Sequence, residues 1–315
     1  MAVWNPQDRR LALVLQGGGS FGAFTWGVLD RLLQDHVAFD AISGASAGAV
    51  DAVLLASGMQ RGGPEGARAA LTGFWADVAK APGLPPFMLN ALAASAQFIS
   101  PYNYPLNLNP MRDLLLRHVD FDRLRAHPPM RLFIAATRVR DGSSVIFREV
   151  EVSVDVVLAS ACLPLLHRAV EIDGEAYWDG AYSANPPLRR LATETAAEDI
   201  LLVQIMPEEE DKVPHSSSEI TQRAQMITFN ASLQHELQSL EDLRASCNGT
   251  KAMFSPICRK LRRQHLHRLA ATDSVEDLSS HSMMDTSAAL LRKLHDAGRD
   301  AASAWLARQE LEQAA

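Results

Sequence analysis

The sequence predicts an α/β protein with a mostly parallel central sheet, and two stretches carry that prediction. LALVL at 11–15 reads as a short buried strand, and a glycine-rich loop and apolar residues at helical spacing follow it. FDAISG at 39–44 predicts a second strand, followed by a tight turn and a buried helix over 47–57 with Gly58 near its end. Strand, loop and helix, then strand, turn and helix, is the order in which parallel sheets are built.

The later segments fit the same class. After a glycine-rich loop at 62–66, we expect helices over 67–80 and 112–119 and strands over 131–139 and 143–152. VDVVLASACLP predicts a buried helix that ends at Pro164, and Asp173-Gly174 predicts a hairpin turn. A buried strand is expected over 199–206, then long helices over 217–246 and 285–309. No composition shift cuts the chain, so we expect one domain over 1–315 with a helical C-terminal extension over 215–315.

The composition is that of a globular protein. With 315 residues, 47% of them hydrophobic and 21% charged, the chain can bury a core without metal or disulfide support. The net charge of −7 argues against general attraction to nucleic acid or anionic membranes. No signal peptide or membrane-spanning run is apparent. Cys162, Cys247 and Cys258 have no paired spacing, so we expect no disulfide framework, no zinc site and a reducing, cytoplasmic location.

The glycine loop LQGGGSFGAF has three interpretations. Gly17, Gly19 and Gly22 form G-x-G-x-x-G between a strand and a helix, as in dinucleotide-binding loops, and Asp40 lies about 20 residues downstream, where an acid would bind ribose. However, Asp40 stands at the start of its strand rather than at its end. The same loop can hold an oxyanion, because glycines let backbone amides approach a reacting carbonyl closely. The third interpretation is a tight turn without a ligand.

GASAG at 44–48 has the G-x-S-x-G pattern of a nucleophilic serine on a sharp strand-to-helix turn. The alternative is a close-packed helix start with Ser46 as its N-cap. If the two strands are neighbours in a parallel sheet, the turns at their carboxyl ends form one site. The glycine loop just upstream therefore favours the nucleophile, and it favours the oxyanion interpretation of the loop as well.

A nucleophilic serine needs a base, and the sequence offers a carboxylate more readily than an imidazole. None of the ten histidines has an obvious catalytic setting, and His167 is the one histidine that we retain as an alternative base. Asp179 in YWDGAYSANPP follows an apolar hairpin arm, and apolar flanks make a carboxylate more basic. Such an aspartate can act directly as the general base for a serine. The alternative is an ordinary Asp-Gly turn.

Three motifs in order, GGGSFG, GASAG and DGA, resemble the patatin-like phospholipase family. The match covers most of residues 10–205, with ASACLP before the aspartate and NPP after it. The resemblance implies a three-layer α/β/α fold, hydrolysis of lipid acyl esters, and no metal or cofactor. It implies a dyad of Ser46 as nucleophile and Asp179 as base, without histidine. It also implies an oxyanion hole at the backbone of the two turns: Gly17, Gly18, Gly19, Gly22 and Ala47.

One position departs from the family pattern. Family members often carry Arg or Lys just before the last glycine of the loop, where this chain has Phe21. Losing that charge would weaken the binding of an anion or a head group. The backbone donors of the oxyanion hole would remain.

Two segments are candidates for contact with lipid. Residues 82–110 are rich in proline, and the apolar stretch 86–104 within them is either a lid or interfacial helix or a buried core helix. The basic run either touches anionic head groups or forms a solvated surface, which we favour; it comprises Arg259, Lys260, Arg262, Arg263 and Arg268. The expected partners are a lipid or acyl-ester substrate and, transiently, a membrane surface, but no nucleic acid.

The same residues are compatible with other functions. A carboxylesterase or thioesterase acting on soluble acyl groups would use the same residues. Two functions of other classes are a dinucleotide-binding protein that uses the glycine loop and a catalytically silent scaffold that keeps the fold.

Overall fold

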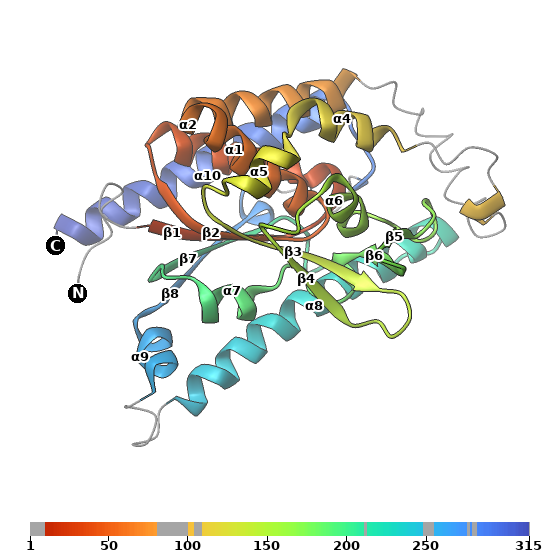
Figure 1. Cartoon of the computed structure of the whole chain (residues 1–315). Helices are drawn as coiled ribbons and strands as arrows, with labels where there is room; N and C mark the ends of the chain where they lie inside the picture. The colour runs from red at the N-terminus through yellow and green to blue at the C-terminus, as the bar shows by residue number, and fades with distance from the viewer. Residues whose placement is uncertain are drawn as a thin grey trace.

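A computed structural model describes residues 10–80, 100–103, 109–210, 213–247, 255–275, 278 and 282–314. Its strands are β1 (Arg10–Leu15), β2 (Ala38–Gly44), β3 (Arg131–Arg138), β4 (Ser144–Arg148), β5 (Val170–Ile172), β6 (Glu175–Asp179), β7 (Asp199–Gln204) and β8 (His265–Ala270). These strands form one eight-stranded sheet in the order β5-β6-β3-β2-β1-β7-β8, and β4 pairs with β3. Helices cover both faces (Figure 1), so the predicted three-layer α/β/α class is confirmed.

The sheet is parallel at its centre and antiparallel at one side. β3, β2, β1, β7 and β8 run parallel to one another, whereas β4, β5 and β6 pair antiparallel. β7 is buried along its whole length, as expected of a strand with helices on both faces. Asp173 and Gly174 have φ angles of 51° and 80° at the turn between β5 and β6, so the predicted hairpin is confirmed.

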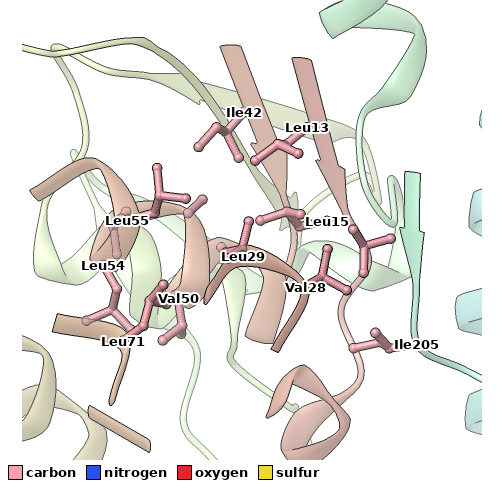
Figure 2. Packing of buried hydrophobic residues seen from close by; sticks show 14 of the residues in the cluster. Leu13, Leu15, Val28, Leu29, Ile42, Val50, Leu54, Leu55, Leu71 and Ile205 are labelled. Atoms are coloured by element: carbon pink, nitrogen blue, oxygen red, sulfur yellow. The ribbon is translucent and has the colours of Figure 1, made fainter. Parts of the chain in front are cut away.

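One face of the sheet carries most of the helices (Figure 1), and they are α1 (Gly22–Gln34), α2 (Ala47–Lys80), α4 (Pro110–His118), α5 (Phe121–Ala126), α6 (Val154–Ser160) and α10 (Ala288–Ala314). Leu13 and Leu15 of β1 pack there with Val28 and Leu29 of α1 in the larger hydrophobic core (Figure 2). Side chains alternate along β1, so Ala12 and Val14 face the opposite layer.

A buried carboxylate joins three helices of that face. Asp30 of α1 accepts a hydrogen bond from Arg68 of α2 at 2.7 Å and pairs with Arg299 of α10. Burial acts to raise the pKa of Asp30. Hydrogen bonds from His295 and Arg68 and the charges of both arginines outweigh burial and hold the pKa well below its usual range. The carboxylate therefore stays ionised and helps to dock α10.

The other face carries α7 (Leu188–Glu194), α8 (Ser217–Ser246) and α9 (Pro256–Arg263) (Figure 1). These helices contribute residues to a second core cluster. Cys247, just after α8, and Cys258 in α9 form a disulfide with their Cα atoms 5.0 Å apart. The expectation that no disulfide forms was wrong. A separation of 11 residues matches no motif, and only the packing of α9 against α8 brings the two thiols together.

Two expected elements differ in the structure. The helix expected to end near Gly58 continues to a break at Gly62 and Gly63, where φ and ψ leave the helical region. A Cβ on Gly58 would lie 2.4 Å from the Cα of Ala67, so Gly58 permits the second half of α2 to fold back. Beyond residue 215, where helices were expected, β8 pairs parallel with β7. β8 is partly exposed and polar, and its sequence HLHRLA lacks the continuous apolar run of a buried strand.

The candidate lid over 82–110 lies mostly outside the described residues. Within it, Pro101–Asn103 forms a short 3-10 turn, and the Asn109 side chain caps α4 by accepting from the Met111 amide at 3.1 Å. The Tyr102 hydroxyl accepts a hydrogen bond from the Ala169 amide at 3.1 Å. None of the described helices combines the length and apolarity needed to cross a membrane.

Candidate active site

The pairing of β1 with β2 places the two predicted turns side by side. Leu15 and Gly44 are partners in the parallel register, so the glycine loop and the serine turn leave the same edge of the sheet. A Cβ on Gly48 would lie 2.1 Å from the carbonyl oxygen of Leu15, and one on Gly44 would lie 2.4 Å from that of Gly48. The glycines of G-x-S-x-G are therefore required by close backbone approach.

Ser46 has a left-handed backbone conformation, with φ of 52°. This region is costly for a residue with a side chain, and it persists only where the surroundings hold it. Here the Ser46 amide donates to both the carbonyl oxygen and the hydroxyl of Ser160, at 3.1 and 3.0 Å. Ser160 therefore anchors the turn that presents the Ser46 side chain.

Asp179 reaches Ser46 from the far side of β3. It is the last residue of β6 and pairs with Ala136 of β3. Ala136 is two residues beyond Ile134, where the pairing of β3 with β2 ends. Its amide donates to the Cys162 carbonyl at 2.9 Å, and its carbonyl accepts from the Thr137 hydroxyl at 2.7 Å. The backbone at Asp179 is thus held on both sides.

The two predicted residues are in direct contact. Ser46 Oγ donates to Asp179 Oδ2 at 2.8 Å, and Asp179 Oδ1 accepts from the Ala181 amide at 2.8 Å. The Asp179 side chain is completely buried. Burial raises the pKa of Asp179 to about 7, although the hydrogen bonds from Ala181 and Ser46 lower it. The carboxylate is therefore far more basic than an exposed aspartate.

The glycine loop does not offer all of its amides to a ligand. The Gly17 amide donates to Asn185 Oδ1 at 2.7 Å, and the Gly22 amide donates to the carbonyls of Gly19 and Ser20. Among the described residues, the amides of Gly18, Gly19 and Ala47 have no hydrogen-bond acceptor. Within the part of the chain that the structure describes, these three amides are the candidate oxyanion donors of the two turns.

The geometry supports neither a histidine as the base for Ser46 nor a dinucleotide site at the glycine loop. Among the described residues, Asp179 is the one whose side chain hydrogen-bonds Ser46 Oγ. His167 is partly buried, which lowers its pKa. Asp40 accepts from the Thr195 hydroxyl at 2.6 Å and the Ala196 amide at 2.8 Å near the start of β2, at the edge of the sheet away from the glycine loop. Within the described residues, no group of three His, Cys, Asp or Glu is placed to hold a metal ion.

The residues that support the site were not predicted from the sequence. Ser160 and Asn185 lie within the ASACLP and NPP stretches that flank the aspartate, and these stretches were the available signal. Gln16 and Asn230 had none, because a polar residue at the end of a strand or within a long helix is ordinarily solvated. Both side chains are buried here.

The fold and this site define a class, that of three-layer α/β/α proteins that present a serine on a strand-to-helix turn to a buried carboxylate. Residues 13–192 match the family model of the patatin-like phospholipases, and the chain belongs to that family.

Several known proteins are similar to this chain. Patatin-like phospholipase domain-containing protein 2 of human and of rat are each 28% identical over 262 residues, which is 80% of this chain and 45% and 48% of those proteins. The chain thus spans about half the length of these relatives. VipD of Legionella pneumophila has 14% identity and a TM-score of 0.44, with 98% of this chain and 68% of VipD covered. The ExoU–SpcU complex of Pseudomonas aeruginosa has 15% identity and a TM-score of 0.39, with coverage of 96% and 52%.

Proposed function

We propose that this chain hydrolyses acyl esters of lipids through Ser46 and Asp179. The observation that carries the proposal is the 2.8 Å hydrogen bond from Ser46 Oγ to a fully buried carboxylate. A serine activated by an adjacent base needs no imidazole, provided that the base can accept its proton. A pKa of about 7 lets Asp179 be ionised at neutral pH and still bind a proton well.

The reaction then has two halves. Ser46 Oγ attacks the ester carbonyl carbon while its proton moves to Asp179, and the carbonyl oxygen becomes an oxyanion. As the oxyanion collapses, the bond to the alcohol breaks, and the alcohol leaves with the proton from Asp179. Water then attacks the acyl-enzyme and gives a proton to Asp179. The fatty acid leaves, and Ser46 regains its proton.

We assign the oxyanion hole to the amides of Gly18, Gly19 and Ala47. Gly18 and Gly19 belong to the glycine loop, Ala47 belongs to the same turn as Ser46, and no described residue accepts from these amides. Removing one such donor typically costs about 100-fold to 1000-fold in kcat. The amides of Gly17 and Gly22 already have hydrogen-bond acceptors within the protein. These two glycines would instead allow the loop to pack closely against the Ser46 turn. A Cβ on Gly22 would lie 2.9 Å from the Cβ of Ala47.

A lipid surface is the proposed source of substrate. Leu165 and Met284 are 49% and 42% exposed. Leu165 follows Cys162, whose carbonyl accepts from Asp179, and Met284 follows Met283, whose carbonyl accepts from the Ser20 amide at 2.8 Å. Because both side chains are exposed and close along the chain to the site, we place the proposed transient contact with a membrane here.

The basic run over 259–268 is a poorer candidate for membrane contact than these apolar side chains. Lys260 donates to the Thr193 carbonyl at 2.9 Å, Arg262 donates to the Cys247 carbonyl, and Arg268 lies 3.6 Å from Glu208. These contacts favour a role for the run within the fold. A cytoplasmic location stays a prediction, and the Cys247–Cys258 disulfide argues against a reducing compartment.

Hydrolysis of p-nitrophenyl esters over a range of acyl lengths tests the proposal. Ser46→Ala and Asp179→Asn should each lower kcat by about three orders of magnitude or more, because nucleophile and base act as a unit. Asp141→Asn, at an exposed turn, is the matched control and should leave kcat unchanged.

The outcomes separate the alternatives. Activity that increases with acyl length and extends to phosphatidylcholine vesicles supports a lipid hydrolase, whereas activity confined to short soluble esters or thioesters supports the rival hydrolases. If Asp179→Asn stays active while Ser46→Ala does not, another base operates, and His167→Ala is the next variant. A wild-type protein inert toward all esters supports a scaffold, and measured binding of NAD or NADP would support a dinucleotide protein.

A further inference from the structure

We propose that three buried amide side chains, Gln16, Asn185 and Asn230, form one network that fixes the glycine loop, and that Asn230 is a positioning residue for acylation. The inference rests on the proposed function and deepens it. Asn230 belongs to α8 and lies outside residues 13–192, which match the family model. A helix of the second layer, α8, would thus help to position the groups that react.

Gln16 is the first member of the network. It follows β1, directly before the glycine loop, and its side chain is completely buried. Its Oε1 accepts from the amides of Ile205 and Met206, at 2.8 and 3.0 Å, and its Nε2 donates to Asn230 Oδ1 at 3.2 Å. Because backbone amides only donate, these bonds fix which end of the Gln16 amide faces α8.

Asn230 completes the chain of bonds. Its Nδ2 donates to the carbonyl of Pro207 at 2.5 Å, and its side chain is 7% exposed. A carbonyl only accepts, so Asn230 must present its nitrogen to Pro207 and its oxygen to Gln16. An aspartate could not replace it, because a carboxylate would face the Pro207 oxygen in a buried site.

Asn185 holds the loop from the other side. Its Oδ1 accepts from the Gly17 amide at 2.7 Å, and its Nδ2 lies 3.4 Å from the carbonyls of both Gly17 and Phe229. Phe229 precedes Asn230 in α8. Two successive residues of one helix therefore reach the glycine loop through two different amide side chains.

The segment that Gln16 anchors lies beside one of the proposed oxyanion donors, Gly18. A Cβ on Gly18 would lie 3.0 Å from Met206 Cγ and 3.1 Å from Ile205 Cδ1. Gln16 holds the backbone of these two residues, so a shift of Gln16 would move the surface behind Gly18. Misplacing reacting groups by about 1 Å can cost 100-fold in rate, whereas ground-state binding depends less on such a shift.

The test compares Asn230→Ala with Ser232→Ala. Ser232 is a buried neighbour on α8, 6% exposed, and its hydroxyl has no partner among the described residues, so it is a matched control. We expect Asn230→Ala to lower kcat for a p-nitrophenyl ester at least tenfold with KM changed less than twofold, and Ser232→Ala to alter neither. Asn230→Ser keeps one hydrogen bond, should give an intermediate kcat, and replaces the alanine variant if that variant does not fold.

A transition-state mimic provides the second readout. Ser46 Oγ adds to the carbonyl carbon of an alkyl trifluoromethyl ketone, its proton passes to Asp179, and the ketone oxygen becomes an oxyanion. Inhibition by this ketone should weaken at least tenfold in Asn230→Ala, in parallel with kcat. Inhibition and kcat within twofold of wild type in a folded Asn230→Ala protein would overturn the inference and leave the proposed function standing.

Hydrogen exchange of backbone amides tests the network even if the wild type hydrolyses no ester. The amides of Gly17, Ile205 and Met206 should exchange at least tenfold faster in Asn230→Ala than in Ser232→Ala. This result in an inactive wild type would contradict the proposed function and support the network. Unchanged exchange at all three amides would contradict the network, whatever the activity.

Discussion

A Cβ added to Gly17 would lie 2.7 Å from the Cβ of Ser46. The glycine loop and the nucleophile turn are therefore packed with no room for a single methyl group between them. The backbone of Ala45 closes the same space, with its carbonyl oxygen 2.6 Å from the added Cβ. Gly17 is needed here for close approach, because φ at this position is not in the left-handed region.

We therefore expect Gly17→Ala to push the loop away from Ser46. Because the contacts include backbone, the chain cannot relieve the clash by turning a side chain, and kcat should fall by about 100-fold or more. Gly62→Ala is the control, since nothing lies within 4 Å of its added Cβ and its φ is −160°. Steady-state kinetics and melting temperature would be measured for both. A Gly17→Ala protein with more than half of the wild-type kcat would contradict the packing.

The pH dependence of kcat/KM should follow the ionisation of Asp179. Only the ionised carboxylate can accept the Ser46 proton, so activity should rise with pH through a midpoint near 7 and then level off. Because ionisation of a carboxyl group involves little enthalpy, the midpoint should hardly move between 10 and 35 °C. A midpoint that shifts strongly with temperature would indicate an imidazole instead.

Asp179→Asn should stabilise the fold at high pH. Burial raises the pKa of Asp179 from 3.8 to about 7, so between these values the folded protein keeps a proton that the unfolded chain has lost. Stability therefore falls as pH rises through this window, and the penalty is complete above about 7, at on the order of 1 kcal/mol per pKa unit.

The asparagine variant lacks this penalty. Its melting temperature should exceed that of wild type at pH 8, and the difference should shrink toward pH 4. Asp141→Asn should show no such gain, because hydrogen bonds from Ser143 lower the pKa of Asp141. An Asp179→Asn protein less stable than wild type at pH 8 would show that the carboxylate supports the fold.

Reduction of the Cys247–Cys258 disulfide should lower stability and leave catalysis intact. The bond closes a short loop between α8 and α9, and the chain-entropy model assigns such a loop about 3 kcal/mol. Dithiothreitol should lower the melting temperature of wild type but not of a variant with both cysteines changed to serine. If reduction lowered kcat at a temperature where the protein stays folded, the disulfide would affect catalysis, and this prediction would be wrong.

The sequence alone predicted the class of fold, and it singled out the serine and the aspartate that the structure brings into contact. Both depend on local signals, since LALVL and FDAISG are apolar enough to be buried on both faces of a sheet, and GASAG and DGA are short motifs with steric requirements of their own. The break in α2 falls within the glycine-rich loop expected at 62–66, whereas the continuation of the helix past Gly58, the strand β8 and the disulfide were not predicted. Each depends on where a distant segment packs, so the residues themselves carry a weak or misleading local pattern.

The tertiary structure decided how the site is assembled. Ser46 and Asp179 are 133 residues apart, and only the register of β2, β3 and β6 brings their side chains within 2.8 Å. Gln16 and Asn230 look like ordinary polar residues until the fold buries them and leaves each side-chain amide with partners from other segments. The physical reason is that a hydrophobic pattern specifies which face of an element is buried, whereas a hydrogen bond between distant side chains requires the positions of several elements at once.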